Sequence, residues 1–231
     1  MDRVERSERI LEVAGELLLA WGYDRLTIDE IARRAKVGKG TVYLHWKTKD
    51  ALFLAVVLRS QFRNHHRQLA RMRADPLEIL PSRMLRGLFC DFLNDPVLRA
   101  VYTDDVDVLG RLNDTAKKEL TELIAEGDRM LCRHLEVLRG YGLVHDDLEV
   151  HHQQYALMAM ATGFFTGEAL LAGRAPVDPE VRADILARTV RGALETPGGQ
   201  KAAAAAAPEV IALYEQFGEL TLREIRRQVR D

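Results

Sequence analysis

The sequence predicts an all-α protein, with a small three-helix domain at the N-terminus and a larger helical domain after it. The composition favours helices, because Ala, Leu, Arg and Glu are abundant whereas aromatic residues make up only 6% of the chain. Apolar residues recur at helical spacing, and no segment alternates as a half-buried strand would. With 231 residues and 47% apolar content, the chain can form one sizeable core or two smaller ones.

The first predicted helix carries its apolar residues on one face. They follow the spacing i, i+4, i+7, i+8 and i+11: Ile10, Ala14, Leu17, Leu18 and Trp21. Gly22 comes directly after the last of them, where a helix commonly ends.

Two shorter helices follow, joined by a turn that contains two glycines. Thr27, with Glu30 three residues later, has the pattern of a capping box that opens the second helix. The sequence VGKG then predicts a tight turn, in which Gly38 and Gly40 are able to take conformations closed to other residues. We expect the third helix to run from about Gly40 to Trp46.

The rest of the chain is predicted to be helical with a few breaks. Thr48 can cap a long fourth helix, and the two Asp-Pro pairs bracket another, because the residue before proline avoids the helical region. The expected helices cover residues 49–72, 76–95, 114–139, 148–171 and 179–194, with a looser segment at 97–113.

Positive charge is concentrated in the segment that holds the second and third helices. The formal net charge of the chain is −2, but Arg25 to Lys49 contains seven Lys and Arg against two Asp and Glu, a local charge of +5. The remaining residues carry −7. A basic segment on an acidic body is typical of a protein that binds a polyanion.

Two short helices joined by a turn on a helical platform form a helix-turn-helix, whose second helix enters the major groove of DNA. Val42 and Trp46, four residues apart, are expected to face inward and anchor this helix. Lys39, Thr41 and His45 are then expected to face outward.

The backbone of the DNA has its own predicted contacts. Tyr43 lies to one side of the third helix, where its hydroxyl can donate to a phosphate. The amide groups at the helix starts near Thr27 and Lys49 are further phosphate donors.

The stretch LTIDEIARRAKVGKGTVYLHWKTKDALF resembles the DNA-binding domain of the TetR family of bacterial transcriptional regulators, over about residues 8–53. The threonine that opens the second helix, the glycine turn, the "TVY-x-H-aromatic" helix and the lysine of the fourth helix all match. Trp46 departs from the family pattern, where phenylalanine is commoner, and we expect a fuller core there. By this resemblance the DNA-binding residues are Thr27, Lys39, Gly40, Thr41, Tyr43, His45 and Lys49.

The resemblance also implies the function of the remaining chain. Residues 1–48 would be the DNA-binding domain, 49–195 a helical domain for ligand binding and dimerisation, and 196–231 a flexible joint plus an extra helix. Such a protein binds a palindromic double-stranded operator as a homodimer, represses transcription, and is released by a small-molecule effector. We expect it in the bacterial cytoplasm.

The effector pocket is predicted from two stretches rich in Phe, Met and small residues, FCDFL and YALMAMATGFFTGEALLAG. Such residues line apolar cavities with adaptable walls, which favours an apolar or aromatic ligand, but they would equally suit plain core or a dimer seam. The candidate pocket residues are Phe89, Phe92, Tyr102, Leu131, Met158 and Phe165.

Other patterns give no enzyme, metal or cofactor. The DDVD sequence at 104–107 lacks a partner motif, and a single Glu-x-x-His at Glu149 and His152 is half of a di-metal site at most. Cys90 and Cys132 are expected to be small core residues. No apolar run is long enough to cross a membrane. The alternative function is a helical enzyme or small-molecule-binding protein that carries a helix-turn-helix.

The C-terminal tail poses a separate question. TPGGQ predicts a flexible joint, and the run KAAAAAA has high helix propensity. Apolar residues then recur at helical spacing from Val210 to Val229, and this face must dock somewhere, because in water it would be an exposed apolar patch. We expect it to dock across the dimer on the other subunit, since a flexible joint permits that reach; the alternative is an extra core helix on its own subunit.

Overall fold

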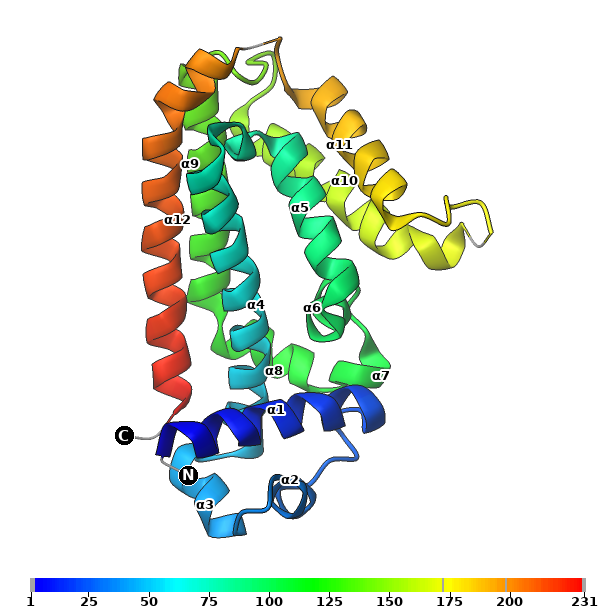
Figure 1. The fold of residues 1–231 in the computed structure, drawn as a ribbon, viewed down its shortest axis with the longest axis vertical. Helices are drawn as coiled ribbons and strands as arrows, with labels where there is room; N and C mark the ends of the chain where they lie inside the picture. The colour runs from blue at the N-terminus through cyan, green and yellow to red at the C-terminus, as the bar shows by residue number, and fades with distance from the viewer. Residues whose placement is uncertain (1–2, 172, 198, 230–231) are drawn as a thin grey trace. The chain divides into compact units, whose positions relative to one another are not determined.

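The computed structural model describes residues 3–171, 173–197 and 199–229, and within them the chain is helical (Figure 1). The helices are α1 (Arg3–Trp21), α2 (Ile28–Ala35), α3 (Lys39–His45), α4 (Lys49–Ala74), the 3-10 helix η1 (Pro76–Ile79), α5 (Pro81–Asn94), α6 (Pro96–Tyr102), α7 (Val106–Leu109), α8 (Leu112–Glu119), α9 (Thr121–Gly140), α10 (Val150–Leu170), α11 (Pro179–Leu194) and α12 (Gln200–Gln228). In the described ranges there is no strand, only one isolated antiparallel bridge between Val144 and Glu195. The predicted all-α class is confirmed.

The chain forms two compact units. The first contains Met1–Phe62, Pro96–Ile124 and Leu220–Asp231, and the second contains Arg63–Asp95 and Ala125–Glu219. Both α4 and α12 contribute residues to each unit, so the units do not follow single cuts of the chain.

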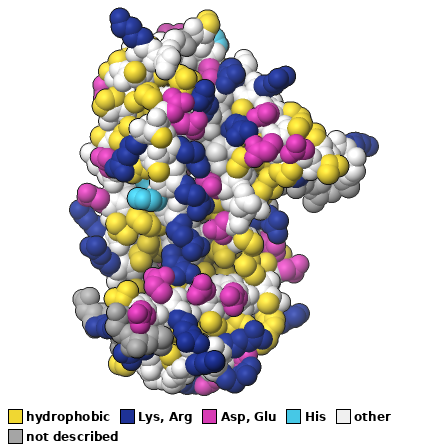
Figure 2. Space-filling model, viewed as in Figure 1, with side chains coloured by type: hydrophobic (Ala, Val, Ile, Leu, Met, Phe, Trp, Pro, Cys, Tyr) yellow, Lys and Arg dark blue, Asp and Glu magenta, His cyan; other side chains and the backbone are white. Residues whose placement is uncertain are grey.

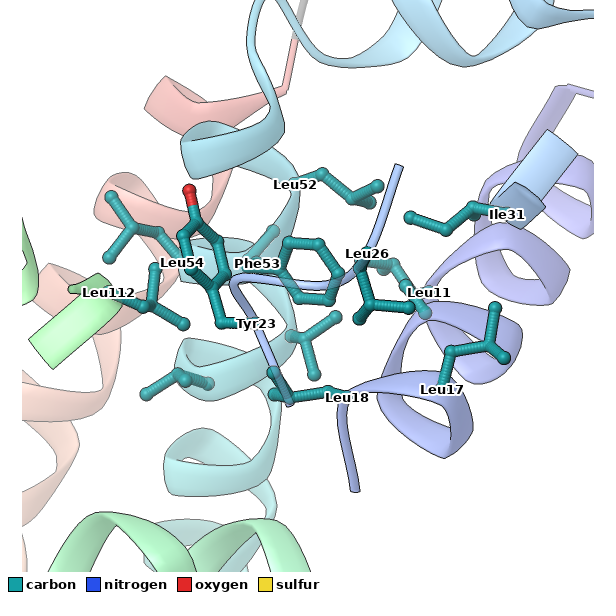
Figure 3. Packing of buried hydrophobic residues seen from close by; sticks show 14 of the residues in the cluster. Leu11, Leu17, Leu18, Tyr23, Leu26, Ile31, Leu52, Phe53, Leu54 and Leu112 are labelled. Atoms are coloured by element: carbon teal, nitrogen blue, oxygen red, sulfur yellow. The ribbon is translucent and has the colours of Figure 1, made fainter. Parts of the chain in front are cut away.

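The first unit is built around a buried apolar cluster from α1 to α4 and α6 to α8. Tyr23 and Phe53 meet edge to face with ring centroids 5.3 Å apart, and Figure 3 shows these two rings among leucines that include Leu18 and Leu112. Fully burying a side chain of this size contributes about 1.5–3 kcal/mol, so this cluster fixes α2 and α3 against α1 and α4.

Local signals in the sequence place several helix ends correctly. The Thr27 hydroxyl accepts from the amide of Glu30 at 3.3 Å and caps α2, and the Thr48 hydroxyl accepts from the amide of Ala51 at 3.0 Å at the start of α4. Gly22 follows α1 with φ +75°, and a Cβ there would lie 2.2 Å from the carbonyl oxygen of Asp107. Only glycine fits this position, for both reasons.

The turn between α2 and α3 is closed by Lys36 and not by the glycines. Lys36 has φ 56°, and its amide and that of Val37 return to the last carbonyls of α2, as in a Schellman motif. Gly38 has φ −70° as the N-cap of α3, and Gly40 lies inside that helix. The turn therefore does not use the conformational freedom that the two glycines offer.

Several helix boundaries also differ from the prediction. The segment at 97–113 is not loose, because most of it belongs to α6 and α7. The expected helix over 114–139 is divided at Leu120 into α8 and α9. The last helix starts at Gln200, so it includes the alanine run and Pro208. The alanine run is helical because Ala203, Ala206 and Ala207 are buried as one face of it.

In the second unit, a buried polar cluster holds α12 to α4, α5 and α9. Tyr214 is buried, and its hydroxyl lies 2.9 Å from the sulfur of Met84 and 3.3 Å from Nδ1 of His134. Nε2 of His134 lies 2.9 Å from the carbonyl of Ile79, which can only accept, so this nitrogen carries the proton. His65 stacks on the ring of Tyr214, and its Nε2 lies 2.6 Å from the backbone carbonyl oxygen of Tyr214.

The C-terminal helix therefore docks within its own chain. Val210 is fully buried and Tyr214 nearly so within the single chain. The expected docking across the dimer is wrong, because the face of α12 already finds its apolar and polar partners in the same subunit. The start of the expected flexible joint is also held, since Thr196 donates its amide to Leu143 and its hydroxyl to Gly142. Residue 198 of the joint lies outside the described residues.

The docking of α12 predicts a large loss of stability for Tyr214→Ala. Removing a buried ring costs about 3–5 kcal/mol, because a cavity remains and the hydroxyl's partners lose a contact. Chemical denaturation should show this loss, whereas Gln216→Ala, at an exposed position of the same helix, should leave the free energy of unfolding unchanged. Equal stabilities of the two variants would contradict the docking.

The burial of His134 predicts that the free energy of unfolding decreases at mildly acidic pH. Burial lowers its pKa to about 4, from 6.5 in the unfolded chain. Well above pH 6.5 His134 is neutral in both the folded and the unfolded chain, and its full contribution to stability is present. As the pH falls from about 6.5 to 4, the unfolded chain takes up a proton that the folded protein cannot, and up to about 3 kcal/mol is lost.

The measurement compares unfolding free energies of the wild type and His134→Gln between pH 7 and pH 4. Burial also lowers the pKa of His65, so the wild-type profile contains both contributions. The difference between the two profiles isolates His134, and parallel profiles would show that its protonation is not linked to folding.

Candidate nucleic-acid interface

The exposed face of α3 consists of four residues. Lys39, Gly40, Tyr43 and Leu44 are exposed, and the spacing i, i+1, i+4, i+5 places them on one side of the helix. Val42 and Trp46 are buried, as predicted. Figure 2 shows Lys and Arg side chains over the part of the surface that carries α2 and α3, at the bottom of the view.

The structure corrects the orientation of His45. Its side chain is only 4% exposed and lies beside Trp46, with ring centroids 5.3 Å apart. The prediction that it faces outward is wrong, because α3 ends at His45 and Trp46 is already extended, with φ −130°. Trp46 reaches the core from beyond the helix end, and His45, three residues after Val42, remains on the inner face. Burial, and then the charges of Arg3 and Arg6, lower the pKa of His45.

Thr41 lies at the edge of the outer face and is half-buried, so it faces outward only in part. Lys39 does face outward, and its ammonium pairs with Asp29 at 2.7 Å. The hydrogen bond to Asp29 raises the pKa of Lys39, which is therefore charged at neutral pH. An exposed pair of this kind is weak and can be exchanged for a DNA phosphate or base.

Two predicted phosphate contacts also have structural roles. The Thr27 hydroxyl accepts from the Glu30 amide, which leaves its own proton available to a phosphate. The ammonium of Lys49 donates to the carbonyl of Tyr23 at 2.6 Å and lies 4.0 Å from the centre of that ring. Burial, and then the charge of Arg111, lower the pKa of Lys49. Lys49 therefore anchors the loop between α1 and α2 to the start of α4.

Sequence reasoning missed Leu44, which is 66% exposed on the outer face of α3. Leu44 occupies the variable position of the pattern TVY-x-H, so the motif predicts no role for it. The signal was the helical spacing of Lys39, Gly40, Tyr43 and Leu44, which becomes visible once Val42 is placed inward.

Three of the predicted pocket residues come together. Phe89, Phe92 and Phe165 form one buried stack in the second unit, with centroid separations of 5.9, 5.7 and 4.6 Å. Met158 lies on α10 two turns before Phe165, but it is 42% exposed and does not share the burial of these rings. Tyr102 belongs to the first unit, whereas Leu131 is half-buried in the second.

The second unit also has an open polar groove of about 410 Å³ between α5 and α11. It is lined by Glu78, Arg83, Arg86, Asp184, Ala187, Arg188 and Arg191, none of which was predicted. Ion pairs within it, such as Arg86 with Asp184 at 2.7 Å, neutralise much of its charge.

Other candidate sites find little support in the described part of the chain. No group of three His, Cys, Asp or Glu there could hold a metal ion. Cys90 and Cys132 are half-buried free thiols, and burial raises the pKa of both, which disfavours the reactive thiolate. No described helix has the length and apolar character needed to cross a membrane.

The fold and the exposed face of α3 define a helix-turn-helix protein of the DNA-binding class. The sequence model described as "Bacterial regulatory proteins, tetR family" matches residues 10–56. This N-terminal segment is thus a DNA-binding segment of the TetR family.

Among curated proteins, the chain is 49% identical over 45 residues to the HTH-type transcriptional regulator YdeS of Bacillus subtilis, a match that spans 20% of this chain and 23% of that protein. It is 26% identical over 172 residues to the HTH-type transcriptional repressor BepR of Brucella suis, across 71% of this chain and 80% of the relative. The strong identity is thus confined to less than a quarter of the length of YdeS.

Solved structures share the fold over most of the chain. FadR from Bacillus subtilis, crystallised in complex with stearoyl-CoA, superposes with a TM-score of 0.62 at 16% identity, over 79% of this chain and 96% of its own. NalD from Pseudomonas aeruginosa, the secondary repressor of the MexAB-OprM multidrug efflux pump, gives 0.60 at 20% identity, over 84% and 98%. At these identities the likeness establishes the fold alone.

We expect Gly40→Ala to have opposite effects on stability and on DNA binding. A Cβ built at Gly40 meets nothing within 4 Å, so the folded protein has no need for glycine there. Gly40→Ala should raise the free energy of unfolding by about 0.5–1 kcal/mol, because alanine favours the helix. The same change should weaken DNA binding if the backbone of α3 must lie close to the DNA.

The two effects are separated by thermal melting and by fluorescence anisotropy with labelled duplex. Gly140→Ala is the matched control, since a Cβ there also meets nothing within 4 Å. Unchanged DNA affinity in Gly40→Ala would mean that this glycine is not required for close approach.

Proposed function

We propose that this chain is a DNA-binding transcriptional repressor that binds a palindromic operator as a homodimer and is released by a small-molecule effector. The observation that carries the proposal is the outward face of α3, where Lys39, Gly40 and Tyr43 are presented by a buried anchor. An exposed helix of this kind in a helix-turn-helix fits the major groove. Such a protein acts on DNA in the bacterial cytoplasm.

The proposed DNA contacts divide by role. Lys39 and Thr41 lie nearest the bases, Gly40 permits close approach, and Thr27, Tyr43 and Lys49 contact phosphates. His45 has a positioning role in this proposal, because its buried ring supports α3 from within. One subunit presents one reading helix, so specificity for an extended site requires two subunits on a palindrome.

The face of α10 and α11 supports the homodimer. The two helices pack together, yet both leave residues that are mostly apolar or small exposed at helical spacing. These residues are Tyr155, Met158, Ala159, Thr162 and Gly163 on α10, and Val181, Ile185, Thr189 and Gly192 on α11. A second copy of this surface would bury them, and a stable interface of this kind covers more than about 1,000 Å².

Two glycines in this face point to close contact between subunits. Gly163 and Gly192 lie inside helices, where glycine costs about 1 kcal/mol relative to alanine. A Cβ on either meets nothing within 4 Å in the single chain, so the fold of one subunit does not explain them. A partner helix that approaches closely does.

Gly192→Leu should therefore dissociate the dimer while leaving the subunit folded. The added side chain would hold the two helices apart. Sedimentation at micromolar concentration should show a monomer, and binding to a palindromic duplex should weaken strongly because the second subunit no longer contributes. Gly140→Leu, at an equally open glycine outside this face, should remain dimeric. A dimeric Gly192→Leu protein would place the interface elsewhere.

The proposed effector site is the interior of the second unit around Phe89, Phe92 and Phe165. Their stacked rings form an apolar wall that suits an apolar or aromatic ligand. The fold shared with FadR, whose structure holds stearoyl-CoA, is consistent with a ligand site in this chain. Ligands found by thermal-shift screening should lose their effect in Phe165→Ala, and an undiminished shift would exclude this wall.

DNA binding itself is tested by its dependence on salt. Selection from random duplexes should recover a palindromic site, and log affinity for it should fall with log salt at a slope near −0.9 per neutralised phosphate. Lys39→Ala should lower affinity for the selected site or reduce the slope by roughly one unit. Lys201→Ala removes an exposed charge on α12 and serves as the control. Affinity that does not change with salt would contradict the proposal.

A further inference from the structure

Leu44 is the apolar residue that α3 presents most openly. Its side chain is 66% exposed on the face formed by Lys39, Gly40, Tyr43 and Leu44. It contributes little to the core of the first unit, which α3 reaches through Val42. A single exposed leucine is ordinary on a protein surface, so its position on the reading helix is what matters here.

The neighbours of Leu44 leave one side of it accessible. Gly40 lies one helical turn before it on the same face and has no side chain, and the space above it is empty to 4 Å. Lys39 and Tyr43, also four residues apart, form a neighbouring row on the same face, with groups that can contact DNA by hydrogen bonds. The face thus has an open apolar row beside a polar one.

The major groove offers one strong apolar feature to such a side chain. Among the four bases, only thymine carries a methyl group there, and apolar side chains contact it directly. Leucine has no donor or acceptor, so it cannot distinguish bases by hydrogen bonds.

We infer that Leu44 reads the 5-methyl group of a thymine in each half-site, with the methyl group seated against Leu44 beside Gly40. This inference rests on the proposed function, and it adds a base preference that the hydrogen-bonding residues do not supply. A cytosine, or a uracil in place of thymine, would leave the leucine facing a polar or empty part of the groove.

The experiment uses the full-length protein and the palindromic duplex recovered by selection from random sequence. Each thymine of one half-site is replaced in turn by uracil, which removes only the methyl group and keeps the base pair. At one position the wild type should lose about fourfold in affinity, since burying one methyl-sized group contributes that much. The symmetric replacement in both half-sites should cost about tenfold or more.

The matched variant is Leu44→Ala. It should bind the thymine duplex more weakly than the wild type does and should no longer distinguish thymine from uracil at the sensitive position. Val106→Ala removes an equally exposed apolar side chain, 73% exposed on α7, and should retain the full difference. Melting curves of the three proteins should coincide, because both changes are at exposed positions.

The outcomes separate this inference from the proposed function. Failure to select any duplex would contradict the DNA-binding function itself. A selected palindrome without a uracil-sensitive thymine would overturn the role of Leu44 alone. So would a Leu44→Ala variant that keeps the wild-type preference for thymine over uracil.

Discussion

The burial of Val42 and Trp46 is the constraint on which the recognition surface depends. α3 is a short helix, and it is held by these two side chains against the core that α1, α2 and α4 provide. Their burial decides which side of α3 remains exposed. Because Trp46 has already left the helix, His45 stays on the inner side, and the outer side is formed by Lys39, Gly40, Tyr43 and Leu44.

Polar contacts then fix the loop that leads into α2. Tyr23 donates a hydrogen bond from its hydroxyl to Asp50 and packs its ring against Phe53. The ammonium of Lys49 donates a hydrogen bond to the backbone carbonyl of Tyr23. A lysine that could otherwise serve only the DNA backbone is thus part of the scaffold. Replacing Lys49 would alter both a charge of the proposed DNA interface and the position of the loop that leads into α2, so a change of DNA affinity in such a variant would have two physical origins.

In the second unit, the main constraint is the burial of the long apolar face of α12. The ring of Tyr214 lies among His65, His134 and Met84, and every one of these contacts comes from the same chain. Burial disfavours the protonated form of His134 and so lowers its pKa. The ring therefore stays neutral in the folded protein, and the free energy of unfolding depends on pH. Because the face of α12 is buried within the chain, the exposed faces of α10 and α11 are the surfaces that the proposed dimer would cover.

The sequence by itself determined the features that are local in the chain. Helical periodicity gave the all-α class, and the caps at Thr27 and Thr48 and the stop at Gly22 each act through atoms a few residues away. The motif TVY-x-H located the reading helix for the same reason. Only the tertiary structure decided the orientation of His45 and Leu44, the left-handed turn at Lys36, and the docking of α12. These depend on where a short helix ends and on which surfaces far away in sequence are available to cover an apolar face, and neither is set by neighbouring residues.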